Sequence, residues 1–112
     1  MTADPELMIE RVLVAVERVP AGCVVSYGDL AELVGTSARR VGAILKDHGG
    51  AVPWWRVVNA SGELPTALLP AARERWAAEG VALAESGRGC RIGAHRADLM
   101  ALGEAYAKGE RS

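Results

Sequence analysis

The chain has 112 residues, of which half are hydrophobic and 24% charged, and its formal net charge is −1. This length fits one domain with a modest core, and the composition is that of a globular protein, which excludes a disordered chain. No apolar run approaches the length of a membrane span, no signal-peptide layout is present, and two cysteines are too few for a disulfide framework, so we expect a cytoplasmic monomer that does not contact membranes.

The first predicted element is an amphipathic helix over residues 5–18. Asp4 is a capping residue, Pro5 suits the first helical position and Glu6 adds an acid to the first turn. Apolar residues then recur at helical spacing, at Ile9, Val12, Leu13, Val16 and Val19. The helix ends at Pro20-Ala21-Gly22, and Cys23-Val24-Val25 is predicted to be a short strand or extended link.

A helix-turn-helix is predicted over residues 26–46. Ser26-Tyr27-Gly28-Asp29 has the Ser-x-x-acid form of a helix cap, and a short helix follows to about Val34. Gly35-Thr36 makes a turn, and Thr36 or Ser37 caps a second helix to about Lys46. We expect one face of that helix to carry Ala38, Val41, Gly42 and Leu45, and the other Arg39, Arg40, Ala43 and Lys46. Because the net charge is close to zero, any DNA contact needs a local basic patch, for which Arg39, Arg40 and Lys46 are the candidates.

Two adjacent tryptophans mark the middle of the chain. Residues 47–51 are predicted to be a flexible link into Val52-Pro53-Trp54-Trp55-Arg56-Val57-Val58, whose last three residues have the pattern of a short buried strand. Asn59-Ala60-Ser61-Gly62 is predicted to be a turn. Since adjacent residues of an extended segment point to opposite faces, we expect Trp54 to line a surface pocket and Trp55 to pack in the core.

The remaining elements are predicted from the proline and glycine residues that begin and end them. Residues 63–69 form a loop without a basic residue, Pro70 opens a helix through about Glu79, and Gly80 ends it. A possible strand at 81–83, a Gly- and Arg-rich loop at 85–93 and a last helix at 95–107 follow. We therefore divide the chain into a domain over residues 5–84 and a C-terminal extension over residues 85–112, a loop plus a helix, that packs on the domain or trails it.

Few residues suggest metal or nucleophile chemistry. Cys23, His48, Cys90 and His95 lack zinc-type spacing, and no phosphate-binding glycine loop is present, so we expect neither a metal nor a cofactor. Cys90 lies between Arg88 and Arg91, an arrangement that can activate a thiol. An incidental loop cysteine is the favoured interpretation.

The segment Pro53-Trp54-Trp55-Arg56-Val57 resembles the active-site segment Pro-Cys-His-Arg-Val of the O6-alkylguanine-DNA alkyltransferases. The resemblance covers roughly residues 9–83. Trp54 stands at the cysteine position and Trp55 at the histidine position, a pattern similar to that of the alkyltransferase-like proteins, which keep the DNA-binding fold and lack the acceptor cysteine. The family glutamate matches Glu79. Because an indole is neither a useful nucleophile nor a general base, we expect no enzyme activity and a degenerate site at Trp54, Trp55 and Glu79.

The resemblance also implies a fold and a set of DNA contacts. The fold is a small, mostly helical α/β domain with a helix-turn-helix of the alkyltransferase C-terminal-domain type and short strands or a hairpin. Tyr27 matches the tyrosine that presses on the phosphate of a flipped nucleotide, and Arg39 matches the arginine that fills the gap in the base stack. Gly42 and Ala43 match small residues that let the helix approach the backbone in a minor groove, and Arg40 and Lys46 add phosphate contacts. The lesion pocket is assigned to Val52, Pro53, Trp54, Arg56, Asn59 and Ser61, and the Asn59–Leu64 turn is expected to form part of its wall.

We therefore expect non-enzymatic recognition of O6-alkylguanine in duplex DNA by nucleotide flipping. The resemblance further implies that the bound protein marks the lesion for the damage-recognition proteins of nucleotide excision repair. One alternative is a helix-turn-helix regulator without lesion selectivity. Another is an enzyme that uses Cys90 or Cys23 as the acceptor.

Overall fold

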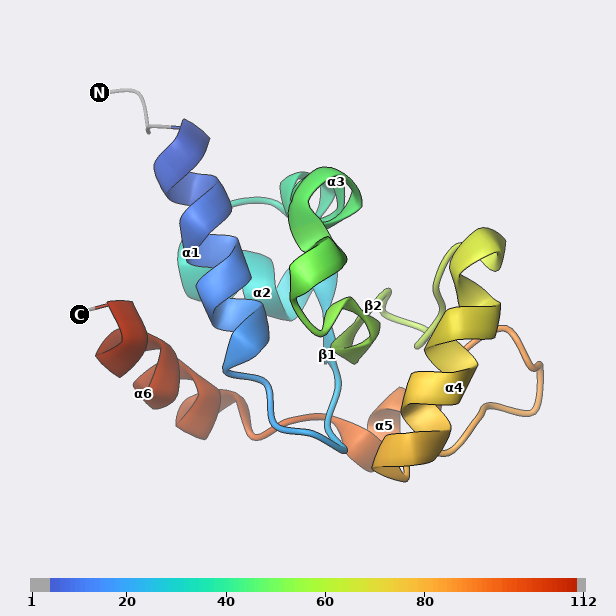
Figure 1. Ribbon diagram of the computed structural model, residues 1–112. Helices are drawn as coiled ribbons and strands as arrows, with labels where there is room; N and C mark the ends of the chain where they lie inside the picture. The colour runs from blue at the N-terminus through green and yellow to red at the C-terminus, as the bar shows by residue number, and fades with distance from the viewer. Residues whose placement is uncertain (1–4, 111–112) are drawn as a thin grey trace.

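A computed structural model describes residues 5–110 and has the fold class expected from the sequence, a mostly helical α/β domain with short strands (Figure 1). The helices are α1 (Pro5–Glu17), α2 (Tyr27–Val34), α3 (Ala38–His48), α4 (Leu69–Glu79), α5 (Ile92–His95) and α6 (Leu99–Glu110), with 3-10 turns at Gly49–Ala51, Trp54–Arg56 and Thr66–Leu68. Strands β1 (Val25–Ser26) and β2 (Val57–Val58) pair in parallel, so they form no hairpin. Among the described helices, none is both long and apolar enough to cross a membrane.

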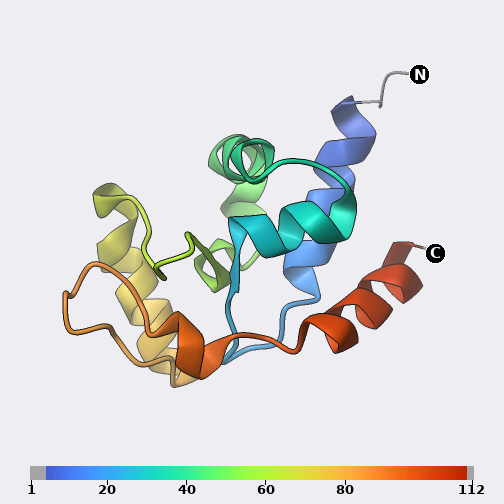
Figure 2. The same ribbon diagram turned by 180° about the vertical axis from the view of Figure 1, so that it is seen from behind.

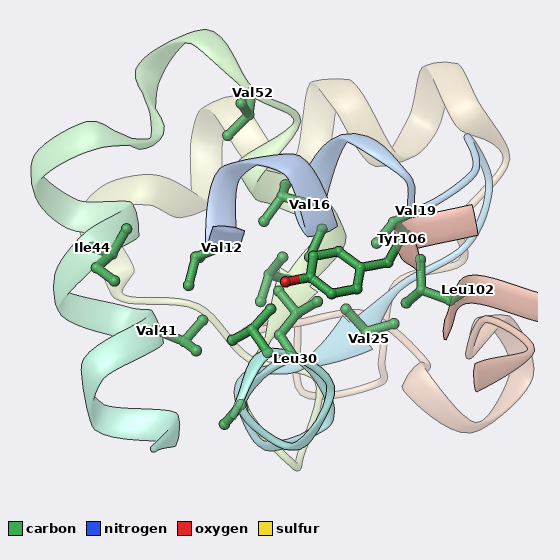
Figure 3. Packing of buried hydrophobic residues seen from close by; sticks show 14 of the residues in the cluster. Val12, Val16, Val19, Val25, Leu30, Val41, Ile44, Val52, Leu102 and Tyr106 are labelled. Carbon is green, nitrogen blue, oxygen red and sulfur yellow. The ribbon is translucent and has the colours of Figure 1, made fainter. Parts of the chain in front are cut away.

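The larger hydrophobic core lies between α1, α2, α3 and α6 (Figure 3). The helical spacing expected for α1 is confirmed at Val12 and Val16, which are buried, while Ile9 and Leu13 are partly buried against the same core. Val19, just after the helix, is also buried. Leu102 and Tyr106 of α6 join the same core from the far end of the sequence. Because each such side chain contributes roughly 1.5–3 kcal/mol when it is buried, α6 is part of what holds α1 in place.

The helix-turn-helix is confirmed together with both of its caps. The Ser26 hydroxyl accepts the Asp29 N–H at 3.0 Å, and the Asp29 carboxylate accepts the Ser26 N–H at 2.9 Å, which is a complete capping box. Gly35, with φ of 83°, ends α2 in the left-handed region. Ser37 then caps α3 by accepting the Arg40 N–H at 3.1 Å. These caps fix where each helix begins and therefore the angle of the turn between them.

Helix α3 is longer than expected, and its faces are divided differently. Asp47 and His48 belong to the helix, and the 3-10 turn Gly49–Ala51 continues it, so the expected flexible link at 47–51 is wrong. Val41 and Ile44 form the buried stripe, whereas Gly42 and Leu45 are only half-buried. Of the four residues expected on one face, only Val41 is fully buried. The reason is that the buried side of α3 consists of positions three apart, Val41 and Ile44, which meet α1 and α2.

A smaller core packs around Trp76 of α4, which stands apart from α1 and α3 in Figure 1. Trp76 is fully buried, and its Nε1–H donates to the Trp55 carbonyl at 2.7 Å. The buried members are Val24, Val58, Leu64, Leu69, Ala72, Trp76, Val81 and Cys90. As expected, Pro70 lies in the first turn of α4, and Gly80, with φ of 76°, ends it. Val58 of β2 and Val24, which directly precedes β1, contribute to this core, which joins α4 to the rest of the domain.

The C-terminal extension differs most from the sequence-based expectation. The helix expected at 95–107 is divided into α5 and α6 because Arg96 is extended and the Ala97 N–H donates to the Val24 carbonyl at 2.9 Å. Asp98 then starts α6, since its carboxylate accepts the N–H groups of Met100 and Ala101 at 3.0 and 3.1 Å. The possible strand at 81–83 is reduced to an isolated bridge between Leu83 and Cys90.

The carboxylate of Glu79, at the end of α4, holds several segments together. It accepts hydrogen bonds from the Gly22 N–H at 3.1 Å, from Trp55 Nε1 at 2.9 Å and from the Arg56 guanidinium at 2.6–3.2 Å. Arg56 Nη1 also donates to the Val19 carbonyl at 3.0 Å. Burial alone would raise the pKa of Glu79, but the donors of Arg56, Gly22 and Trp55 outweigh it and hold the pKa below its ordinary value. Glu79 is therefore a structural acceptor that is ionised in the folded protein.

Replacing Glu79 with Gln is expected to lower the free energy of unfolding by about 3 kcal/mol. That is the lower end of the cost of breaking a buried ion pair, because 13% of the Glu79 side chain and 16% of the Arg56 side chain stay exposed. Since the folded pKa lies below the ordinary value of 4.5, the stabilisation is fully present above pH 4.5 and is lost as the pH falls through the folded pKa. Urea unfolding at several pH values measures both effects.

Glu74→Gln is the matched control for this prediction, since Glu74 is an exposed carboxylate on the same helix. It should change neither the stability at neutral pH nor the acid dependence by a comparable amount. The assignment fails if Glu79→Gln and the wild-type protein lose stability in parallel on acidification.

Candidate nucleic-acid interface

A groove of about 740 Å³ opens between α3 and the chain that leads into α4. Figure 2 shows these two segments, in green and yellow-green, facing each other. One wall is formed by α3 and the turn after it, with Ala38, Arg39, Gly42, Leu45, Lys46, Gly49 and Gly50; the other has Leu64, Pro65, Ala67 and Leu68. Tyr27 and Trp54 complete the lining. The groove therefore combines an apolar wall with a wall that carries two cations.

The first turn of α3 concentrates positive charge at the groove. Arg39 and Arg40 are exposed there, and the turn contains no acidic residue. Cations at a helix N-terminus oppose the helix dipole, so this arrangement costs rather than adds helix stability in the free protein. An anion such as a phosphate would relieve that cost. Arg39 and Lys46 border the groove, whereas Arg40 and Ala43 are exposed on α3 without lining it.

Two glycines in the groove wall have no packing reason to be glycine. A Cβ added at Gly42 or at Gly50 would meet nothing within 4 Å, and neither residue has positive φ. Both residues line the groove. The surface of α3 is thus left bare where an external partner would approach the backbone.

Tyr27 is the first residue of α2 and lies directly after the Ser26 cap. Its ring is half-buried and packs against both hydrophobic cores. Burial raises the pKa of the Tyr27 hydroxyl, so it stays protonated at neutral pH and can act as a hydrogen-bond donor. The ring borders the groove beside a helix N-terminus, which is a favourable place for an anion.

Trp54 lines the groove, but the reason given for it from the sequence is wrong. Residues Trp54–Arg56 form a 3-10 turn, in which the Trp54 N–H donates to the Val52 carbonyl at 2.7 Å. Adjacent side chains in such a turn do not alternate between two faces. The rings of Trp54 and Trp55 instead meet edge to face, with centroids 5.7 Å apart and an interplanar angle of 85°.

Trp55 packs against the smaller core but stays half-buried, so the expectation that it packs in the core is met only in part. Two guanidinium groups lie over its ring, with the Arg75 Cζ 4.8 Å and the Arg56 Cζ 5.5 Å from the ring centroid. Its Nε1–H donates to Glu79 at 2.9 Å. The core position belongs to Trp76. Trp55 is thus a polar-edged support for Trp54, held by cation–π contacts and one hydrogen bond.

The other residues expected in the lesion pocket lie outside the groove lining. Val52 is buried in the larger core, and Arg56 is bound to Glu79. Asn59 instead shapes the turn after β2, where its side-chain oxygen accepts the N–H groups of Ser61 and Glu63 at 2.9 and 2.8 Å. Pro53 and the exposed Ser61 do not line the groove either. Of the six expected residues, Trp54 alone lines it.

Several lining residues were missed, and the helical period would have found some of them. Residues 38, 42, 45 and 49 recur at intervals of three or four, so extending α3 through Gly49 puts Leu45 and Gly49 on the groove side with Gly42. Leu64, at the end of the Asn59–Leu64 turn expected in the pocket wall, does line the groove. No comparable signal marks residues 65–68, because they enter the groove only through the chain's return toward α4.

The cysteines and histidines do not assemble into a reactive site. Cys90 is buried in the smaller core, and burial raises the pKa of its thiol, which disfavours the thiolate. His95 Nε2 accepts the Ala82 N–H at 3.0 Å, so His95 has a structural contact. Within residues 5–110, no three His, Cys, Asp or Glu side chains gather as a metal site would require.

Comparison with known proteins identifies the family. Residues 8–81 match the model of the 6-O-methylguanine DNA methyltransferase, DNA binding domain. The chain is 41% identical over 85 residues to a DNA base-flipping protein of Escherichia coli (strain K12), which covers 70% of this chain and 66% of that protein. A protein of the same name from Vibrio parahaemolyticus is 31% identical over 84 residues, covering 70% of this chain and 84% of the relative.

A solved structure has the same fold. The crystal structure of S. pombe Atl1 in complex with damaged DNA containing O6-carboxymethylguanine superposes with a TM-score of 0.73 at 28% identity, and the match covers 88% of this chain and 99% of that chain. The chain therefore belongs to the family of the 6-O-methylguanine DNA methyltransferase DNA-binding domain, and within it the chain is an alkyltransferase-like protein.

Proposed function

We propose that this protein recognises O6-alkylguanine in duplex DNA by flipping the damaged nucleotide into the groove beside Trp54, without transferring the alkyl group. The observation that carries this proposal is the composition of the groove. By the resemblance to the alkyltransferases, the indole of Trp54 takes the place of the acceptor cysteine, and it lies in one groove with Tyr27, Arg39 and the bare face of α3. Relatives named for base flipping and a related structure bound to damaged DNA support it.

Each part of the groove has a role in nucleotide flipping. Gly42 lets the α3 backbone approach a sugar-phosphate chain in the minor groove, and Arg39 supplies a planar cation that can occupy the gap in the base stack. Tyr27 supplies bulk and one hydrogen bond at the phosphate of the rotated nucleotide. Flipping costs a few kcal/mol, and stacking of a base on an aromatic ring such as Trp54 returns about 1–3 kcal/mol of it.

The same groove favours an alkylated base over a normal one. The wall opposite α3 is made of Leu64, Pro65, Ala67 and Leu68, which offer apolar surface. Each CH₂ group buried against such a wall contributes about 0.8 kcal/mol. A normal guanine has no alkyl group to bury and gives up a full set of pairing hydrogen bonds on leaving the duplex. Selectivity for the alkylated base therefore comes from burial of its alkyl group and from the larger cost of unpairing a normal guanine.

By the resemblance, alkyl transfer lacks two of its three components, because Trp54 and Trp55 stand at the cysteine and histidine positions and Glu79 alone is kept. The indole of Trp54 is no nucleophile, and the Glu79 carboxylate is engaged by Arg56, Trp55 and Gly22. A protein that binds a lesion and cannot repair it must pass it on. We therefore also propose that the bound protein marks the site for proteins of nucleotide excision repair, as its resemblance to alkyltransferase-like proteins implies.

Titration of an O6-methylguanine duplex against its undamaged twin at one fixed salt concentration tests the binding proposal. We expect the damaged duplex to bind at least roughly tenfold more tightly, a difference of about 1.4 kcal/mol. Arg39→Ala should weaken lesion binding by about 1–3 kcal/mol, while Arg18→Ala, an exposed arginine away from the groove, should not. Equal affinity for the two duplexes would favour a helix-turn-helix regulator without lesion selectivity.

Gly42→Ala separates stability from binding. Because the added Cβ meets nothing within 4 Å, the variant should gain about 0.8–1.0 kcal/mol of stability from helix propensity. The same methyl group should weaken DNA binding by about 1–3 kcal/mol, the cost of overpacking a close contact. Thermal unfolding and the titration above measure the two effects.

Gly103→Ala in α6 is the control for this pair of effects. Its added Cβ would reach Leu33 Cδ1 at 3.7 Å, an ordinary contact, so it should stabilise the protein and leave DNA affinity unchanged. Unchanged DNA affinity in Gly42→Ala would argue that α3 does not approach the DNA backbone at this glycine.

Intact-protein mass spectrometry after prolonged incubation with O6-methylguanine DNA should detect no added methyl group. The reason is the pair of observations that Trp54 occupies the cysteine position and that burial raises the pKa of the Cys90 thiol. A stoichiometric mass gain on Cys90 or Cys23 would identify a transferase instead. Unfolded protein, whose thiols are exposed, treated with a small alkylating reagent, provides the positive control.

A further inference from the structure

The C-terminal extension reaches the residue that is proposed to drive flipping. The family model matches residues 8–81, so the extension lies beyond the segment that this model covers. The chain between α5 and α6 nevertheless crosses beside β1 (Figure 2). There the Val24 N–H donates to the His95 carbonyl at 2.9 Å, and the Ala97 N–H returns a bond to the Val24 carbonyl at 2.9 Å. This parallel bridge fixes Arg96 next to the strand that leads into Tyr27.

One carboxylate connects Arg96 to the start of α2. Asp29, whose side chain is 8% exposed, accepts the Ser26 N–H at 2.9 Å and also accepts Nε and Nη2 of Arg96. The two arginine bonds are bidentate, so they fix the orientation of the carboxylate as well as its distance. Since Ser26 is the cap of α2 and Tyr27 is its first residue, the chain of contacts runs from Arg96 through Asp29 and Ser26 to Tyr27.

Loss of Arg96 should change the orientation of the Asp29 carboxylate more than it changes the free energy of unfolding. The Arg96 side chain is 50% exposed, and an ion pair with such a partner contributes little to the free energy of unfolding. Burial alone would raise the pKa of Asp29, but the Arg96 and Ser26 donors outweigh it and hold the pKa below its ordinary value. Without Arg96, the carboxylate keeps the Ser26 N–H as a donor but loses the bidentate bonds that fix its orientation.

We propose that Arg96 is a positioning residue for Tyr27, and that the C-terminal extension thereby controls how efficiently the protein flips a nucleotide. The inference rests on the proposed function and adds a component to it. Arg96 acts through Asp29 and the cap of α2 and makes no DNA contact of its own. The C-terminal extension is accordingly part of the DNA-binding apparatus.

The test combines Arg96→Gln, Arg96→Lys and Tyr27→Ala, alone and in the double variant Tyr27→Ala/Arg96→Gln. The DNA carries 2-aminopurine next to O6-methylguanine, so its fluorescence rises when the damaged neighbour leaves the stack. We expect Arg96→Gln to weaken lesion binding roughly threefold to tenfold and to reduce the fluorescence rise, with little change in unfolding midpoint. Arg96→Lys, which keeps the charge but not the bidentate bond, should recover part of the loss. Arg88→Gln, an exposed arginine of the same extension, should behave as wild type.

The double variant decides between a positioning role and a direct contact. If Arg96 acts through Tyr27, Arg96→Gln has no further effect once Tyr27 is Ala. Additive losses would identify Arg96 as a DNA contact and overturn the inference, as would a wild-type fluorescence rise in Arg96→Gln. A wild-type protein that neither prefers the lesion nor brightens the probe would instead refute the proposed function itself.

Discussion

The carboxylate of Glu79 joins the two parts of this protein. One part is the core shared by α1, α2, α3 and α6, and the other is the smaller core around α4. The sheet between them has only two residues in each strand, which is too little to set their relative position. Glu79 supplies what the sheet lacks, because it binds the turn after α1 through Gly22 and the start of β2 through Trp55 and Arg56.

The groove inherits its shape from this arrangement. Its α3 wall belongs to the larger core, whereas Leu64 belongs to the smaller one, so the distance between the walls depends on how the two cores are joined. Tyr27 packs against both cores and Trp54 rests on the ring that Glu79 holds. These packing contacts fix the rotamers of Tyr27 and Trp54, which must bind a ligand in one geometry.

Local chemistry made part of the fold predictable. The caps at Ser26 and Ser37, the helical stripe of α1 and the Pro70–Gly80 limits of α4 depend on neighbouring residues, and the structure contains all of them. The predictions that failed depend on distant partners. Arg96 interrupts the last helix because its backbone neighbours bind Val24, and the segment 65–68 joins the groove only through tertiary packing. For the same reason Trp54 could be identified from its family position, while most of the pocket around it could not.

All three tryptophans lie on one side of the molecule, so tryptophan fluorescence reports on that side alone. Trp76 is buried in the smaller core, and Trp54 and Trp55 pack against it, so all three indoles of the chain report on the α4 side. The aromatic residues of the larger core are the tyrosines Tyr27 and Tyr106. Indole emission would follow loosening of α4 and miss an opening of α1 from α6, whereas far-ultraviolet dichroism would record both. A soluble quencher would reduce the fluorescence of the half-buried Trp54 and Trp55 but not that of the buried Trp76. Native fluorescence therefore follows the α4 side of the molecule without an added label.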